Sequence, residues 1–271
     1  MAILPDAIVK IVARHTTPRT WERGTCLHIA VSDGLSLFNY FNQAGNPTSH
    51  GYVRKTGNTP AVAVGTPLCP VMADYEQYVD TRYRAPAQLE GNPTLISWET
   101  QGGVGADLDA GWTPAQCERL AWLLAQCNKI HGTPLEAMPN SLPKSTGTGY
   151  HRLGVDPWRV DGGEHWSTSY GKVCPGSARM AQIPSIISRA RQLVAPPSAE
   201  DIIDMATQAE VAQAVEAGIG AYMSRFFKDE QGTGDTIWDE SRANHAALMA
   251  KLDSLIAAVE ALTVAVTPPS V

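Results

Sequence analysis

Short apolar runs alternate with turns rich in Gly, Pro and Asn through the first 195 residues, a pattern that excludes an all-helical protein. Four of the runs are typical of strands: CLHIAV at 26–31, HGYVR at 50–54, AVAVG at 61–65 and TLISWE at 94–99. Helical patterns lie between and after them. Strands interspersed with helices predict a domain built around a central sheet, of either the α/β or the α+β class.

Two segments have the periodicity of helices with one apolar face. Residues 113–131 begin with Thr113-Pro114, the pair expected at an N-cap and the first helical position, and Gly132 follows as a stop signal. A second helix is predicted over residues 183–193, where apolar side chains recur every three or four positions.

A proline pair marks the end of this first domain. The stretch APPS at 195–198 is typical of a stiff linker, so we predict a domain over residues 1–195, a linker at 196–199 and a smaller module over 200–271. Apolar residues in the module recur at helical spacing, and Leu248, Leu252, Leu255, Val259 and Leu262 form a short heptad seam. The module is therefore predicted to be all-α. Its seam suits either the packing of one helix on another or self-association.

Charge and hydropathy exclude several classes of partner. The net charge is −6, and the acidity is concentrated in residues 196–271, which hold 12 Asp and Glu against 4 Lys and Arg. Without a basic stripe, nucleic acid is not an expected partner. No apolar run approaches the ~20 residues that span a bilayer, so membrane insertion is not expected. The N-terminus lacks the features of a secretory signal, and the odd set of five cysteines suits a reducing compartment, so we expect synthesis in a cytoplasm.

Three residues are candidates for a metal site. Hydrolytic zinc sites use three protein ligands drawn from His, Cys and carboxylates, and leave a fourth position for water. Cys174 lies in GKVCPG, two positions after Lys172, which would supply a charge beside whatever the thiol binds. His28 interrupts an apolar strand, and His151 follows a Gly- and Thr-rich approach to a loop. Taken singly, Cys174 and His28 are more typical of buried structural residues, and His151 is equally consistent with a plain loop histidine.

The order of several motifs carries a resemblance. The motifs are HIAVSDG at 28–34, TSHGYV at 48–53, NPTLISWETQGG at 92–103, WTPAQ at 112–116, GYHRLGVDPW at 149–158 and GKVCPG at 171–176. In this order they resemble the zinc N-acetylmuramoyl-L-alanine amidases, which share a fold with peptidoglycan recognition proteins and amidase-type phage lysozymes. The chain looks most similar to amidase domains of endolysins from phages of actinobacteria. The similarity covers residues 20–195 and implies an α/β fold, with a central mixed sheet flanked by helices.

The resemblance also implies a site and a reaction. Zn2+ would be held by His28, His151 and Cys174, and the substrate would be bacterial peptidoglycan. The bond cut would be the amide between N-acetylmuramic acid and L-alanine. Glu99, at the end of a central strand, would carry the proton from water to the leaving amine. Lys172 would stabilise the oxyanion.

The chain departs from the family pattern in two places. His151 and Cys174 are 23 positions apart, so an insertion at 155–167 must loop out between them, and His165 becomes a rival metal ligand. We prefer His151 because Gly149 to Arg152 resembles the strand end that presents the ligand in relatives. Some relatives also place a catalytic Tyr just before a strand His, whereas this chain has Ser49 before His50. Neither His50 nor Tyr52 is assigned that role, and His50 is expected to be structural.

Four tryptophans have two interpretations. Trp158 and Trp166 flank the insertion, where they would either form a wall of a glycan groove or pack the loop onto the sheet. Trp98 and Trp112 are expected in the core.

Three functions are consistent with these features. The first is an endolysin made in the host cytoplasm that acts on the cell wall after release, with the C-terminal module serving wall association or oligomerisation. The second is a non-catalytic peptidoglycan-binding protein of the same fold. The third is a wall-degrading component of a virion. The presence of both Glu99 and Lys172 beside the three candidate ligands favours an enzyme.

Overall fold

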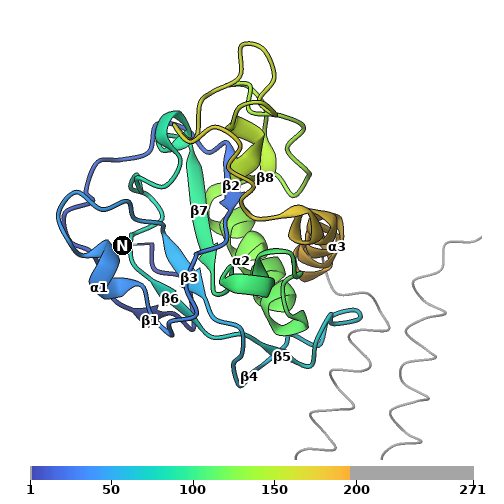
Figure 1. Cartoon of the computed structure of the whole chain (residues 1–271). Coiled ribbons are helices and arrows are strands. Elements are labelled where there is room, and N and C mark those ends of the chain that lie inside the picture. Colours follow the sequence, from blue (N-terminus) through green and yellow to red (C-terminus); the bar gives the residue numbers. More distant parts are fainter. Residues whose placement is uncertain (1, 196–271) are drawn as a thin grey trace, which may run out of the picture. The chain divides into compact units, whose positions relative to one another are not determined.

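A computed structural model describes residues 2–195 of the chain (Figure 1). The predicted linker at 196–199 and the predicted helical module at 200–271 lie outside the described residues, so both stay predictions.

A six-stranded mixed sheet forms the centre of the described domain (Figure 1). Its strand order is β1-β6-β3-β7-β2-β8, with β3 and β6 antiparallel and the other neighbours parallel. A separate two-stranded ladder joins β4 to β5. The strands are β1 (Ile8–Val9), β2 (Gly24–Leu27), β3 (Gly51–Val53), β4 (Thr59–Pro60), β5 (Val71–Met72), β6 (Tyr75–Gln77), β7 (Leu95–Thr100) and β8 (Gly147–Tyr150).

Helices flank this sheet, and two of them supply most of the largest apolar cluster. They are α1 (Phe38–Phe41), α2 (Pro114–His131) and α3 (Ser177–Val194). The largest core cluster joins residues of β2, β3 and β7 to α2 and α3, and α3 packs against α2. The predicted α/β class with a central mixed sheet and flanking helices is confirmed. Trp98 and Trp112 both lie in this core, as expected. Among the described residues, no helix combines the length and apolarity that a membrane span would require.

Three neighbouring parallel strands, β7, β2 and β8, run in register. Leu27, the last residue of β2, pairs with Trp98 on one side and Tyr150 on the other. The next residue along each chain segment is therefore brought to the same edge of the sheet. Those residues are His28, Glu99 and His151.

The predicted boundaries of α2 are accurate because its ends carry strong local signals. The Thr113 hydroxyl accepts a hydrogen bond from the Gln116 backbone N–H, and the Gln116 side chain accepts one from the Thr113 N–H, which completes a capping box. Gly132 ends the helix in the left-handed conformation, with φ of 69°, which favours glycine.

Helix α3 begins six residues before the predicted start. Its first turns carry polar side chains that bind other segments. Arg179 donates to the carbonyl of Pro175, and the Gln182 side chain exchanges two hydrogen bonds with the backbone of Trp112. These turns therefore lack the apolar periodicity from which the helix was predicted.

The strand predicted at 61–65 is wrong. The structure has no strand there; β4 ends at Pro60. The carbonyls of Val62 and Val64 instead accept hydrogen bonds from the guanidinium of Arg189, which is itself paired with the buried carboxylate of Glu118. Because a side chain satisfies this backbone, the segment has no need of a neighbouring strand.

We predict that Thr113→Ala lowers the free energy of unfolding by about 1–2 kcal/mol, because it removes the cap of α2. It also removes the hydrogen bond that the hydroxyl donates to the carbonyl of Lys55. Urea denaturation of the full chain measures the change. Thr113→Ser, which keeps the hydroxyl, is the control. Equal stability of the Ala and Ser variants would contradict the capping argument.

Candidate metal centre

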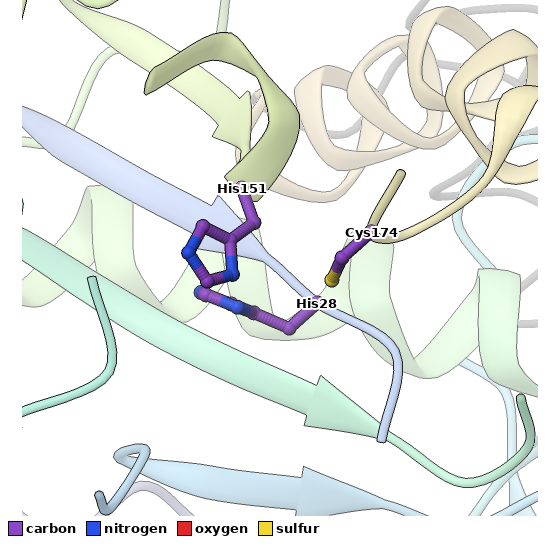
Figure 2. A group of neighbouring side chains, drawn as sticks. All are labelled: His28, His151 and Cys174. Carbon is purple, nitrogen blue, oxygen red and sulfur yellow. The ribbon is translucent and has the colours of Figure 1, made fainter. Parts of the chain in front are cut away.

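Three residues from distant parts of the chain meet at the edge where β2 and β8 end. His28 follows β2, His151 follows β8, and Cys174 lies three residues before α3. One ligand atom from each lies within 4.8 Å of the other two, and all three residues are buried. Figure 2 shows the two imidazole rings beside each other, with the sulfur of Cys174 close by. Within residues 2–195 this is the one group of three or more His, Cys, Asp or Glu residues with such a spacing.

The ring of His151 is held in one tautomer by the backbone. Its Nε2 lies 2.7 Å from the carbonyl oxygen of Trp166, which can only accept, so Nε2 carries the proton. The other nitrogen, Nδ1, is buried and has no hydrogen-bond partner in the described part of the chain. Burial, with a smaller effect of Lys172, lowers the pKa of His151 to about 4. A neutral imidazole with a free lone pair on Nδ1 results.

His28 lies beside this ring, with the two ring centroids 4.6 Å apart. Its Nδ1 is 3.7 Å from a carboxylate oxygen of Glu99, and its buried Nε2 makes no hydrogen bond of ordinary geometry to the described residues. Burial lowers the pKa of His28 well below 6.5, and His151 and Lys172 add to the effect while Gln88 opposes it. His28 is therefore also neutral at pH 7.

Cys174 presents its sulfur to the backbone at the end of β2. The N–H of Ile29 donates to Sγ at 3.3 Å, and the N–H of Arg152 holds the carbonyl of Cys174 at 2.9 Å. Burial, reinforced by the charge of Glu99, raises the pKa of the thiol to about 12. Without a cation the sulfur therefore keeps its proton. The N–H of Ile29 would also stabilise the thiolate once a metal is bound.

The donor set fits a metal ion. Buried polar atoms nearly always have partners, yet a nitrogen of each histidine is buried without one. Tetrahedral zinc with N and S ligands would set the donor atoms about 3.3–3.6 Å apart, which small side-chain rotations reach from the observed spacing. The described residues thus contain a buried His-His-Cys group that could hold a metal ion.

Glu99 and Lys172 line a cavity next to this group. The cavity has a volume of about 640 Å³, and its wall is mostly apolar. It is formed by residues 29–32, by residues near α1 and by residues 172–176, together with Glu99. Burial raises the pKa of Glu99 to about 7, although Lys172 draws it down. One carboxylate oxygen of Glu99 is buried without a partner in residues 2–195, and Lys172 is exposed.

The rival histidine is not part of the group. The side chain of His165 is half exposed, and its Nδ1 lies 3.7 Å from a carboxylate oxygen of Asp156. His50 is fully buried, accepts a hydrogen bond from the N–H of Ser97 and donates to the carbonyl of Tyr83. These contacts agree with the structural role predicted for His50.

The two tryptophans of the insertion behave differently. Trp166 is only 1% exposed and packs against Cys26, Leu95 and Met138, on the opposite face of the sheet from α2. The packing interpretation therefore holds for Trp166. Trp158 is 37% exposed, and the guanidinium of Arg152 lies over its ring at 3.9 Å.

The sequence did not reveal the groups that surround the candidate ligands. The carbonyl of Trp166 and the N–H of Ile29 contribute through the backbone, which no residue pattern reports. The apolar wall near α1 was also missed. Its signal is the run LFNYF at 37–41, which begins three residues after the SDG turn at 32–34.

Fold and site together define an α/β protein with a candidate metal centre at the carboxyl ends of parallel strands. No protein-family model matches the sequence, and no curated protein matches it either.

Among solved structures, the chain is similar to the N-acetylmuramoyl-L-alanine amidase LysC from Clostridium intestinale URNW, with 13% identity, 62% of this chain and 85% of that chain covered, and a TM-score of 0.40. It is also similar to the endolysin amidase LysCS from the same organism, with 13% identity, coverage of 69% and 99%, and a TM-score of 0.42. The third is the hydrolase AmiA from Staphylococcus aureus, with 13% identity, coverage of 72% and 89%, and a TM-score of 0.47. At such values the function of this chain must be inferred from its own residues.

We predict that metal binding releases one proton, and that the proton comes from Cys174. Both histidines are already neutral at pH 7, whereas the thiol, with a pKa near 12, must ionise to bind. The test uses cadmium as the probe metal and the Glu99→Gln variant, whose amide cannot release a proton of its own. The affinity of this variant for cadmium should therefore rise about tenfold per pH unit between pH 6 and 8. Calorimetry in two buffers measures the proton count. A count near zero would exclude the thiol, and a count near three would mean that the histidines start protonated.

Proposed function

We propose that this chain is a zinc-dependent N-acetylmuramoyl-L-alanine amidase that cleaves peptidoglycan between N-acetylmuramic acid and L-alanine. The observation that carries the proposal is the meeting of His28, His151 and Cys174, with a buried nitrogen of each histidine that lacks a partner in residues 2–195, beside Glu99 and Lys172. The same five residues are those that the resemblance to this family implied. We propose residues 1–195 as the catalytic domain.

Two imidazoles and one thiolate suit zinc better than magnesium or calcium, which prefer oxygen ligands. Zinc bound by three protein ligands supplies an acidified water and polarises a carbonyl group. The role of His28, His151 and Cys174 is to hold that ion beside the cavity, whose wall includes Cys174.

Glu99 is the proposed proton carrier. Its pKa of about 7 lets the carboxyl group both take up and release a proton near neutral pH, as general acid–base catalysis requires. The oxygen without a partner faces no competing donor in residues 2–195. In the proposed reaction Glu99 takes a proton from the attacking water and returns it to the leaving nitrogen of L-alanine.

Lys172 is the proposed oxyanion stabiliser. It lines the same cavity as Glu99 and carries the positive charge that a tetrahedral intermediate requires near its oxygen. A positive charge placed in this way commonly lowers the activation free energy by about 3 kcal/mol. Its exposure allows the ammonium group to reach a substrate that enters from solvent.

We further propose that the chain acts as an endolysin, which reaches peptidoglycan in the bacterial wall after release from the host cell. A carboxyl group with a pKa raised to about 7, beside a cation on the same cavity wall, favours an enzyme over a binding protein of the same fold. We propose residues 200–271 as a separate module for wall association or self-association.

The reaction is tested on purified peptidoglycan. Metal analysis of the full chain should find about one zinc per protein. Mass spectrometry of the digest should find free N-terminal L-alanine and intact lactyl groups on the sugar. Cleavage within the glycan, or between residues of the peptide, would refute the proposed bond.

We predict that Glu99→Gln keeps zinc and loses at least about 100-fold in kcat, because the amide cannot carry a proton. Its size and shape are nearly those of the original side chain, so metal content serves as the control for the site. Activity on peptidoglycan and zinc content are measured on the same preparation. Full activity with full zinc content would remove Glu99 from the mechanism.

We predict that truncation after Ala195 changes kcat/KM on a soluble muropeptide by less than about threefold, because a domain with its own core folds alone. Every proposed site residue lies before this point. Hydrolysis of the muropeptide by the full chain is the reference. A truncated protein that binds zinc but does not cut the muropeptide would place part of the active site in residues 196–271.

A further inference from the structure

The insertion at 155–167 returns to the sheet at Trp166. The N–H of Trp166 donates to the carbonyl of Gly154 at 2.7 Å, and the indole ring covers Gly154 so closely that a Cβ there would lie 2.3 Å from the ring. The carbonyl of Trp166 accepts the proton of His151 Nε2. One residue of the insertion therefore both anchors the segment and contacts a candidate metal ligand.

An ion pair between Glu164 and Arg23 holds the indole of this tryptophan in place. Glu164 accepts a hydrogen bond from the indole N–H at 2.9 Å and pairs through the same oxygen with Arg23 at 2.7 Å. Arg23 is completely buried, and its guanidinium lies 5.7 Å from the centre of the indole ring. The carbonyl of Arg23 accepts a hydrogen bond from the N–H of Gly147, the first residue of β8. The ion pair thus ties the insertion to the strands that present His28 and His151.

We infer that Arg23, Glu164 and Trp166 position His151 for metal binding, an inference that rests on the proposed zinc site. A ligand histidine normally donates its second N–H to a fixed acceptor, which selects the tautomer and the ring orientation. Here that acceptor is a backbone carbonyl whose place depends on the indole. The indole depends in turn on a carboxylate and a buried guanidinium. The insertion therefore orients a metal ligand without contributing a ligand itself.

Zinc affinity of the full chain tests the inference, measured by competition with a chromogenic chelator. Glu164→Gln removes the charge that pairs with Arg23, and Trp166→Phe replaces the indole by a smaller phenyl ring, which removes the N–H and keeps the backbone carbonyl. We expect zinc affinity to fall about 10-fold to 100-fold in Glu164→Gln and by a smaller factor in Trp166→Phe. The cobalt-substituted protein should show a changed visible spectrum, because the ring of His151 is less well oriented.

Asp156→Asn is the matched control. It also replaces an acid by its amide, in the same segment, and it also breaks a pair with an arginine, Arg159. That pair is partly exposed, and neither Asp156 nor Arg159 is hydrogen-bonded to His151, Glu164 or Trp166 in residues 2–195, so zinc affinity should change by less than about threefold. The Asp156 carboxylate also lies 3.7 Å from His165, a contact that the amide oxygen of Asn can keep.

A purely structural role has a different signature. It would lower the melting temperature of the metal-free protein and leave zinc affinity, the cobalt spectrum and the zinc-induced rise in melting temperature unchanged. That result in both Glu164→Gln and Trp166→Phe would overturn the inference while the proposed zinc site stands. If Glu164→Gln does not fold, Trp166→Phe decides alone. A wild-type chain that binds no zinc would overturn the proposed function and this inference together.

Discussion

The parallel pairing of β2 with both β7 and β8 is the constraint on which the rest of the site depends. Because the three strands run in the same direction and in register, the residues that end or follow them are brought to one edge of the sheet. His28, Glu99 and His151 come from segments separated by dozens of residues and still lie together. Sites in α/β proteins commonly form at the carboxyl ends of parallel strands for this reason. Cys174 then needs only the loop before α3 to reach the same place.

Burial keeps the candidate ligands and Glu99 in their neutral forms. It lowers the pKa values of both histidines and raises those of the Cys174 thiol and the Glu99 carboxyl group. All four shifts favour neutral forms, so the metal-free site carries little charge in spite of its four titratable groups. Free nitrogens at the histidines and an N–H directed at the sulfur remain. A divalent ion would find its ligands close together and, of their protons, would have to displace only that of the thiol.

Much of the fold was predictable, because local signals and tertiary packing agree. The capping box of α2 and the apolar run of β7 lie where the sequence predicted them. The prediction was wrong at 61–65, where the buried guanidinium of Arg189 replaces a strand as the hydrogen-bond partner. It was short at α3, whose first turns are fixed by polar contacts such as those of Gln182. Both errors occur where a polar side chain binds the backbone of a segment distant in sequence.

The sequence by itself determined which chemical groups the protein has: two imidazoles, a thiol, a carboxylate and an amine in an order that resembles one family. It did not determine their surroundings. Only the tertiary structure brought His28, His151 and Cys174 to one point, left His165 half exposed, and set the carbonyl of Trp166 against a ring nitrogen. The physical reason is that a side chain's type is local information. Its burial, its tautomer and the partners of its donor atoms depend on segments that meet only when the chain folds.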